Sequence, residues 1–420
     1  MPRTPPTINA PIISFVDTGL SNTDGVTNNG IISVSGIATG FTWQYSLDSG
    51  VTWVSGKGSS FTVTGDGPKS VMVRQIDTSG YTSATSSLNF ILDTTASVPI
   101  VALSQDTGNS STDTITKDGT VFLSGLETGG TWQYSTDAGR TWITGSGASF
   151  TLTGDGAKSV LVRQTDLAGN VSGTNKVSFT LDTVALKPIL TLSKDTGSSS
   201  SDGITNTGTV LITGIESGAI WKYSLDQGGT WSNGTSSSIS FSGDGTKSII
   251  VRQTDIAGNI SEDSLLSFTL DTTVANPAVA IFSDTGKSST DAITANGQLN
   301  ITGVENGAKV EYSIDNGTTW STNFSAVEGL NTVLIRQTDL AGNISQGTPI
   351  TFTLDTIAAV APTLSLISDA GASSTDLLTN LGTLNVSGEQ GALVEYSIDN
   401  GATWTQSFTA QEGPNTVMVR

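Results

Sequence analysis

Short hydrophobic runs alternate with polar, turn-forming residues along the whole chain. Runs rich in Val, Ile, Leu and Phe, such as TVFLSGLE and SFTLDT, are separated by clusters of Gly, Ser, Thr, Asn and Asp. The runs return every ~8 to 12 residues, a spacing that is typical of short antiparallel strands joined by tight turns. We therefore predict an all-β fold.

The same order of strands and turns repeats along the chain. The tripeptide DTG or DAG begins at Asp17, Asp106, Asp195, Asp284 and Asp369, so the spacings are 89, 89, 89 and 85 residues. Each unit carries about seven strand-like runs, which suits an immunoglobulin-like (Ig-like) sandwich of ~100 residues. Such a sandwich buries its own core, unlike a solenoid repeat. We predict tandem Ig-like β-sandwich domains in an elongated array.

The joints between units give the predicted boundaries. In sequences such as LDTVALKPI, a few residues and a proline separate the last strand of one unit from the first strand of the next. Short joints with proline restrict bending, so we expect a monomeric rod. The predicted segments are a lead-in at 1–11, Ig-like repeats at 12–97, 98–187, 188–276 and 277–361, and a truncated fifth repeat at 362–420 that lacks the QTDLAGN segment and the final strand.

Charge and composition narrow the range of partners. Eighteen Lys and Arg against 37 Asp and Glu give a formal net charge of −19, which repels phosphate backbones, so we expect no nucleic acid partner. The same acidity suits divalent cations. The chain has no Cys and no His, which excludes disulfides, thiolate or imidazole metal sites and a histidine general base. Because no apolar run reaches about 18 residues, we expect no membrane span, and any secretion signal would lie outside this sequence.

The pattern S-x-D-x-G-x-T-W occurs five times and resembles the Asp-box of sialidase propellers. The copies are SLDSGVTW, STDAGRTW, SLDQGGTW, SIDNGTTW and SIDNGATW. A propeller blade has a period of ~40 to 50 residues, so the observed period argues against that fold. We interpret the motif as a turn, in which Asp137 accepts backbone N–H bonds, Gly139 has a positive φ and the Trp anchors the hairpin. The alternative is a carbohydrate-binding or glycosidase-associated repeat protein.

Two further sets of residues bear on an enzymatic interpretation. Trp43, Trp132 and Trp221 precede a Tyr by two residues, and Val310 and Val394 replace them in the last two units, so we predict core positions. The Arg of each VRQ or IRQ occurs once per unit, and whole sandwiches therefore separate these arginines. We expect each Arg to face outward beside an acidic partner. We predict no catalytic site and no enzyme.

Three segments of the third unit carry a family resemblance. SKDTGSSSSDGIT, GDGTKSIIVRQTDIAGNIS and SFTLDTTVANP resemble the bacterial Ig-like repeats of giant type I-secreted adhesins and biofilm-associated surface proteins. The resemblance covers almost the whole chain. It implies a non-enzymatic, calcium-stiffened stalk that is secreted or displayed on the cell surface and supports cell adhesion or biofilm formation. Contact with a host cell or surface ligand would then fall to modules outside this chain.

The recurring acidic residues form a candidate calcium site at each joint. Ig topology places the A–B loop and the exit of strand G at one pole of a sandwich and the F–G loop at the other. Calcium takes six to eight oxygen ligands, which side chains, loop carbonyls and water can supply. The alternative is that these residues cap their own turns. The predicted ligands are Asp17, Asp24, Asp93, Asp166 and Asn170 at the first joint, Asp106, Asp113, Asp182, Asp255 and Asn259 at the second, and Asp195, Asp202, Asp271, Asp339 and Asn343 at the third.

Overall fold

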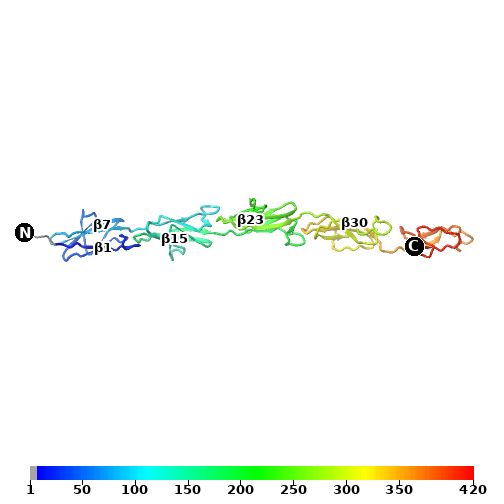
Figure 1. Ribbon diagram of the computed structural model, residues 1–420, viewed down its shortest axis with the longest axis horizontal. Coiled ribbons are helices and arrows are strands. Elements are labelled where there is room, and N and C mark those ends of the chain that lie inside the picture. The colour runs from blue at the N-terminus through cyan, green and yellow to red at the C-terminus, as the bar shows by residue number, and fades with distance from the viewer. Residues whose placement is uncertain (1–6) are drawn as a thin grey trace, which may run out of the picture. The chain divides into compact units, whose positions relative to one another are not determined.

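The computed structural model describes residues 7–420, and every regular element in that range is a β-strand (Figure 1). The all-β prediction is therefore confirmed. Residues 1–6 of the predicted lead-in lie outside the described residues. In the described part of the chain, no helix is long and apolar enough to cross a membrane.

The contacts between residues divide the chain into two compact units. The first holds the residues up to Leu190 together with Ile212–Ser237 and Ile249–Leu266. The second holds Thr191–Leu211, Ser238–Ser248 and Ser267–Arg420. The division passes through the third repeat, and the residues of each joint described below belong to one unit.

Each of the first three repeats contains eight short strands in the same order. In the first repeat these are β1 (Ile12–Phe15), β2 (Val26–Thr27), β3 (Ile31–Ser35), β4 (Thr42–Ser46), β5 (Val54–Ser55), β6 (Ser60–Thr62), β7 (Gly67–Ile76) and β8 (Ser86–Leu92). The second has β9 (Ile100–Leu103), β10 (Ile115–Thr116), β11 (Thr120–Ser124), β12 (Thr131–Ser135), β13 (Ile143–Thr144), β14 (Ser149–Thr151), β15 (Gly156–Thr165) and β16 (Asn175–Leu181). The third has β17 (Ile189–Leu192), β18 (Ile204–Thr205), β19 (Thr209–Thr213), β20 (Ile220–Ser224), β21 (Ser232–Asn233), β22 (Ser238–Ser240), β23 (Gly245–Thr254) and β24 (Ser264–Leu270).

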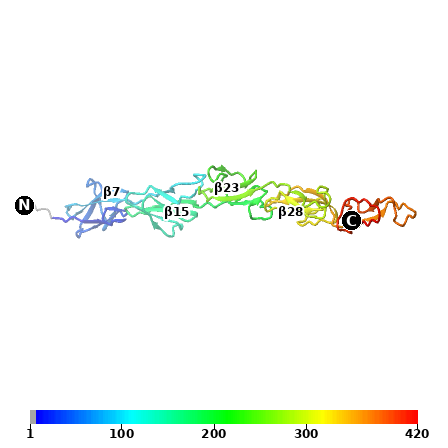
Figure 2. The same ribbon diagram turned by 45° about the vertical axis from the view of Figure 1, so that its right-hand side comes forward.

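The second repeat shows how these strands form a sandwich. One sheet has the order β14-β11-β9, and the other has the order β10-β16-β15-β12-β13. Within the second sheet β10 runs parallel to β16, whereas β15 is antiparallel to both β12 and β16. In a view turned by 45°, β15 and β28 (Lys309–Ser313) each lie among strands of their own repeat (Figure 2).

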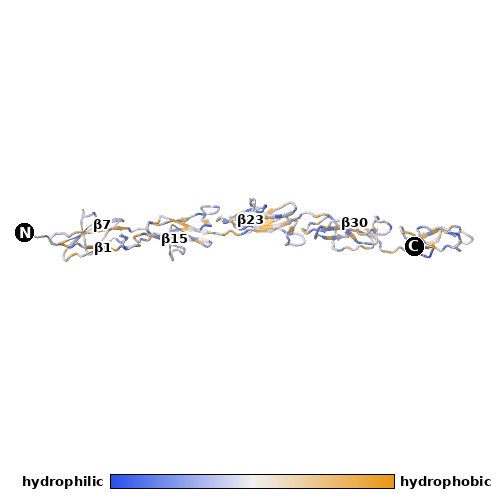
Figure 3. Ribbon diagram, viewed as in Figure 1, coloured by the Kyte–Doolittle hydropathy of each residue, from blue (hydrophilic) through white to orange (hydrophobic). Residues whose placement is uncertain are grey.

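Alternating side chains of the two sheets form the core of each sandwich. In the second repeat, Val121 and Leu123 of β11 meet Val160 and Val162 of β15, and all four are at most 1% exposed. The hydrophobic positions concentrate on strands such as β23, and the loops are mostly hydrophilic (Figure 3). The predicted core tryptophans are confirmed, because Trp43, Trp132 and Trp221 are buried.

The last two repeats have fewer strands than the first three. The fourth consists of β25 (Ala278–Ile281), β26 (Ile293–Thr294), β27 (Leu299–Thr302), β28, β29 (Gly329–Thr338) and β30 (Thr348–Leu354). The fifth consists of β31 (Thr363–Leu366), β32 (Leu384–Ser387), β33 (Tyr396–Ser397) and β34 (Met418–Val419). In both repeats the first sheet is reduced to a pair, β25-β27 and β31-β32.

Candidate metal sites at the joints between repeats

Three groups of acidic side chains, which we call the joint triads, lie where one repeat meets the next. In each triad, one carboxylate oxygen from each of the three residues lies within 4.8 Å of the other two. This spacing allows three carboxylates to hold one metal ion. The triads are Asp93, Glu127 and Asp166 at the first joint, Asp182, Glu216 and Asp255 at the second, and Asp271, Glu305 and Asp339 at the third.

Three separate segments supply the triad at the second joint. Asp182 directly follows β16, and its backbone N–H donates to the carbonyl of Thr116 at 2.9 Å. Glu216 lies in the loop between β19 and β20, and Asp255 begins the loop after β23. The last strand of one repeat therefore ends against two loops of the following repeat.

The amide side chain of Asn259 links the two repeats at this joint. Its Nδ2 donates to the backbone carbonyl of Asp182 at 2.8 Å and to Oδ2 of Asp255 at 2.7 Å. The backbone N–H of Asn259 donates to Oδ1 of Asp255 at 2.8 Å. Asn170 and Asn343 make the same bonds at the first and third joints. Asp255, which directly follows β23, is thus oriented by hydrogen bonds from its own loop.

A buried glutamine positions the glutamate of the triad. The side chain of Gln253 is fully buried; its Oε1 accepts the backbone N–H of Glu216 at 2.8 Å. Its Nε2 donates to the carbonyls of Leu186, in the joint, and Gly214. The backbone N–H of Leu186 donates in turn to Oε1 of Glu216. Burial without loss of hydrogen bonds keeps this arrangement rigid.

The triads concentrate negative charge, and no ion pair among the described residues offsets it. Among residues 7–420, none of the ion pairs involves a triad carboxylate. Burial raises the pKa of Asp271, and the charges of Asp339, Asp244 and Glu305 act in the same direction, against a hydrogen bond from the backbone of Thr273. Crowded, partly desolvated carboxylates of this kind favour a bound cation.

The structure brings together part of the set predicted from the sequence. Asp93 and Asp166, Asp182 and Asp255, and Asp271 and Asp339 meet in the triads, together with Glu127, Glu216 and Glu305, which the sequence analysis missed. The three predicted Asn residues lie at the joints as hydrogen-bond donors. The Asp residues of the A–B loops lie outside the triads and accept backbone N–H bonds within their own loops: Asp17, Asp24, Asp106, Asp113, Asp195 and Asp202.

In the first Asp of each A–B loop, one of the two carboxylate oxygens accepts no hydrogen bond from the described residues. Oδ2 of Asp106 accepts the backbone N–H of Thr114 at 2.9 Å, whereas its Oδ1 is buried and has no hydrogen-bond partner among the described residues. The same holds for Asp284 and Asp369 of the fourth and fifth repeats. This feature therefore belongs to each A–B loop and does not depend on a triad.

A second contact at each joint joins the DTG turn to the LAGN or IAGN segment of the next repeat. The hydroxyl of Thr107 donates to the carbonyl of Ala257 at 2.7 Å. The backbone N–H of Asn109 donates to the carbonyl of Ile256 at 3.2 Å. Between them, Gly108 has φ +97° and lies so close to Ile256 that only a residue without Cβ fits.

The Asp-box copies build hairpins, as predicted. Oδ1 of Asp137 accepts the backbone N–H of Thr141 at 2.9 Å, Gly139 has φ +84°, and Nε1 of Trp142 donates to the carbonyl of Gly139. Each Trp ring then lies under an arginine, with 4.0 Å between the Trp142 ring and the guanidinium of Arg163. These contacts are structural and local to one repeat.

The arginine partners differ from the prediction. Arg74 and Arg163 donate to Gln44 and Gln133, so an acidic partner is wrong for the first two repeats. In the third repeat Arg252 lies over Trp231 and is aligned with Lys222 on the neighbouring strand, and none of the ion pairs among the described residues involves it, so the predicted acidic partner is wrong there too. The prediction holds for Arg336 with Glu311 and for Arg420 with Glu395.

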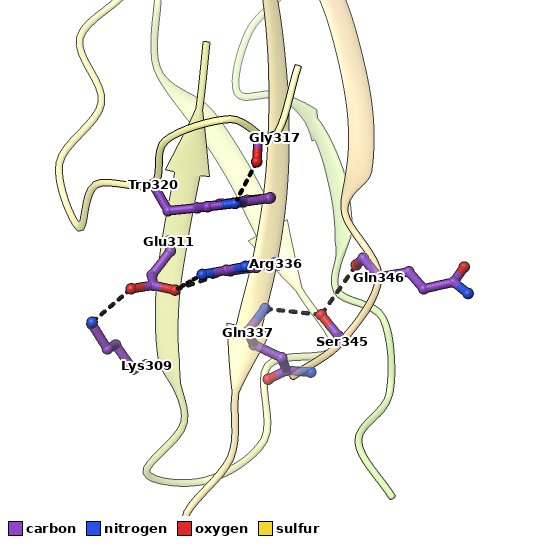
Figure 4. Close-up of polar contacts among 8 residues, drawn as sticks. All are labelled: Lys309, Glu311, Gly317, Trp320, Arg336, Gln337, Ser345 and Gln346. Atoms are coloured by element: carbon purple, nitrogen blue, oxygen red, sulfur yellow. Dashed lines mark hydrogen bonds and ion pairs between the residues drawn. The ribbon is translucent and has the colours of Figure 1, made fainter. Parts of the chain in front are cut away.

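Figure 4 shows the residues around the corresponding arginine of the fourth repeat, Arg336. Glu311 accepts hydrogen bonds from Lys309 at 2.6 Å and from Nη2 of Arg336 at 2.8 Å, and the Arg336 guanidinium lies 3.9 Å from the Trp320 ring. The hydrogen bond from Lys309 is the main reason that the pKa of Glu311 lies below its ordinary value. On the same long strand, the backbone N–H of Gln337 donates to the hydroxyl of Ser345 at 2.9 Å.

Comparison with known proteins finds similarity to a family model over part of the chain. Residues 185–272 match the family model of the bacterial Ig-like domain. Among solved structures, the chain is similar to a tetra-tandem repeat in the extending region of a large adhesion protein, with 18% identity over 83% of this chain and 100% of that chain, at a TM-score of 0.28. It is also similar to fibronectin(III)-like modules of CbhA from Clostridium thermocellum, with 12% identity over 41% of this chain and 93% of that chain, at a TM-score of 0.25. No curated protein matches the sequence.

Proposed function

We propose that this array of bacterial Ig-like repeats is a non-enzymatic spacer of a secreted or cell-surface bacterial adhesin, and that calcium at its joints stiffens it. The observation that carries the proposal is the recurrence of the joint triad at three successive joints. Carboxylates that meet only where two sandwiches meet would couple metal binding to the orientation of one repeat against the next. In this proposal the mechanical units are the repeats at 12–97, 98–187, 188–276 and 277–361, followed by the shorter repeat at 362–420.

The donor set fits calcium in its chemistry. At the second joint Asp182, Glu216 and Asp255 would hold the ion, and each offers a hard carboxylate oxygen. Neither nitrogen nor sulfur side chains that would favour zinc or copper are available, because the chain has no His and no Cys. The bound ion would supply positive charge that offsets the repulsion among the three carboxylates.

A spacer role also agrees with how the conspicuous side chains are used. The tryptophans of the TWQYS strands are core residues, and the Asp-box residues hold their own hairpins. Each VRQ arginine lies over a tryptophan of the same repeat, so these arginines do not converge on one substrate carboxylate. The proposed place of action is outside the cell, with adhesion or biofilm formation as the outcome and type I secretion as the route.

Calcium titration by calorimetry on the full chain tests the proposal. The three joint triads predict three sites per chain in the absence of competing metal. A variant with Asp182, Glu216 and Asp255 all replaced by their amides should lose one site and keep two. If this variant kept the same number of calcium sites as the unmodified chain, the calcium part of the proposal would be contradicted. The absence of saturable binding at millimolar calcium would contradict it as well.

A further inference from the structure

The fourth repeat has an open sheet edge where the first three repeats have a third strand. In the second repeat, β11 pairs with β9 on one side and with β14 on the other. In the fourth repeat, the equivalent strand β27 pairs with β25, and the sheet ends there. Unpaired strand edges are templates for the addition of another strand.

The registers show which residues correspond. Leu103 lies opposite Val121 in the second repeat, and Ile281 lies opposite Leu299 in the fourth. On the other side of β11, Phe150 of β14 lies opposite Val121. A strand that completed the sheet of the fourth repeat in the same way would therefore place an aromatic residue opposite Leu299.

A shorter loop is the reason that the third strand is missing. The segment from Trp to Arg spans Trp142 to Arg163 in the second repeat but only Trp320 to Arg336 in the fourth, which is five residues shorter. Residues 323–327 of the fourth repeat follow an irregular path and form no strand. Too little chain is left there to make both the strand and its turns.

The missing strand uncovers part of the core. Val121 and Leu123 are at most 1% exposed in the second repeat, whereas Leu299 and Ile301 are half-buried. A groove of about 860 Å³ follows the edge of β27 and is lined by the apolar side chains of Phe282, Leu299, Ile301, Tyr312 and Leu354. Phe324, Ser325 and Ala326 of the irregular segment also line it, so this segment lies beside β27 without forming a strand with it. The fifth repeat has a similar groove of about 530 Å³ beside β32, lined by Leu384, Tyr396 and Phe408.

We propose that the open edges of β27 and β32 bind an extended peptide that adds as a strand, with an aromatic residue in the groove and Ser or Thr on either side. The chain itself shows the fitting occupant, because the S-F-T strand β14 covers the same edge in the second repeat. Its Phe150 stacks on Tyr134 with ring centroids 4.2 Å apart. In the fourth repeat Phe324 of the irregular segment takes this place less closely, with its ring 5.8 Å from that of Tyr312, and the bound peptide would displace it.

The backbone would supply hydrogen bonds and the groove would supply selectivity. In the second repeat the N–H of Leu123 donates to the carbonyl of Ala148 at 2.8 Å, and the N–H of Leu152 donates to the carbonyl of Gly119 at 2.9 Å. Because such pairs alternate along an antiparallel ladder, the N–H of Phe150 also points to β11. A bound peptide would use the same groups toward β27.

A peptide of the sequence GSGASFTLTGD, residues 145–155 of the second repeat, is the direct probe. Fluorescence anisotropy of the labelled peptide with the full chain should show saturable binding with at most two peptides per chain. A Phe150→Asp peptide should bind at least about tenfold more weakly, because it loses the aromatic contact. A peptide with an N-methyl group on the backbone nitrogen of Phe150 should lose a similar factor in affinity. Its side chain is unchanged, but that nitrogen can no longer donate a hydrogen bond to the strand.

A chimeric chain supplies the matched control on the protein side. Replacing residues 321–332 with residues 143–159 gives the fourth repeat its own third strand, and the number of bound peptides should fall by one. Equal binding of all three peptides would overturn strand addition in favour of non-specific apolar contact. Absence of saturable binding, or five equivalent sites per chain, would overturn the proposal outright. Neither arm depends on calcium, so the calcium proposal can fail independently.

Discussion

The backbone of Gly108 lies against the carbonyl oxygen of Ile256 so closely that a Cβ on Gly108 would be 1.9 Å from that oxygen. The same relationship joins Gly19 to Leu167 and Gly197 to Leu340 at the other two joints. In the first three repeats the glycine of the DTG turn is therefore required by the close approach of the next repeat as well as by its own positive φ. Direct contact between repeats accompanies each acidic triad.

Gly108→Ala should loosen the second joint. The added methyl group overlaps Ile256, and relieving such an overlap costs about 1–3 kcal/mol. Hydrogen exchange should become faster at Asn109, whose N–H donates to the carbonyl of Ile256. The control is Gly286→Ala, which has a similar φ of +98° but no heavy atom within 4 Å of the added Cβ. Equal effects of both substitutions on exchange at Asn109 would contradict this explanation.

Glu216→Gln should weaken calcium binding at one site by at least about tenfold, because one of three carboxylates loses its charge. Asp113→Asn should leave all three sites in place, because Asp113 caps its own turn through the N–H of Ile115. Calorimetric titration of the two variants beside the unmodified chain measures both outcomes. Loss of a site in Asp113→Asn alone would favour the ligand set predicted from the sequence.

Acid should weaken the Asp-box hairpins. The side-chain hydrogen bond from Thr52, followed by other hydrogen bonds, lowers the pKa of Asp48 to about 2 from an ordinary value of 3.8. The unfolded chain therefore binds the proton more tightly, so this contribution to stability is present above pH ~4 and is lost as the pH falls towards 2. Thermal unfolding between pH 5 and pH 2 measures the slope, and Asp48→Asn should reduce it. An unchanged slope would show that the hairpin does not depend on the ionised carboxylate.

Limited proteolysis should begin in the fifth repeat. There β34 has two residues, whereas the corresponding β29 has ten and pairs on both sides. Leu377 and Leu378 are 77% and 72% exposed. Segments with few strand pairs and uncovered apolar side chains open most readily. Mass spectrometry of the first fragments identifies the cleavage sites, and early cuts within the second or third repeat would be the opposite of this expectation.

Local patterns could be predicted from the sequence because they depend on neighbouring residues. The strands, the core position of Trp132 and the turn made by Asp137 follow from alternation and turn chemistry within one repeat. The triads could be predicted only in part, because each joins segments from two repeats. Glu127, Glu216 and Glu305 did leave a signal, since the equivalent residue in the first repeat is Ala38, which accompanies no triad among the described residues.

Other features depend on distances that a sequence does not contain. The sequence pattern did not single out Gln253, which follows Arg252. Its side chain nevertheless hydrogen-bonds to the backbone of Glu216 and to that of Leu186 in the joint. The close approach of Gly108 to Ile256 was hidden because glycine also suits the turn itself. The arginine partners were mispredicted in the first two repeats because a tryptophan and a glutamine occupy the place assigned to a carboxylate.

Small-angle X-ray scattering of the full chain, in millimolar calcium and then in excess chelator, measures whether calcium stiffens the array. Bound calcium should hold each joint in one arrangement by mass action, by about 2.7 kcal/mol per site at a hundredfold excess over the dissociation constant. Removal of the ion should leave the carboxylates of each triad repelling one another, so that the joints bend. The maximum dimension and the radius of gyration should therefore be larger with calcium than with chelator. Identical values in the two conditions would contradict calcium stiffening.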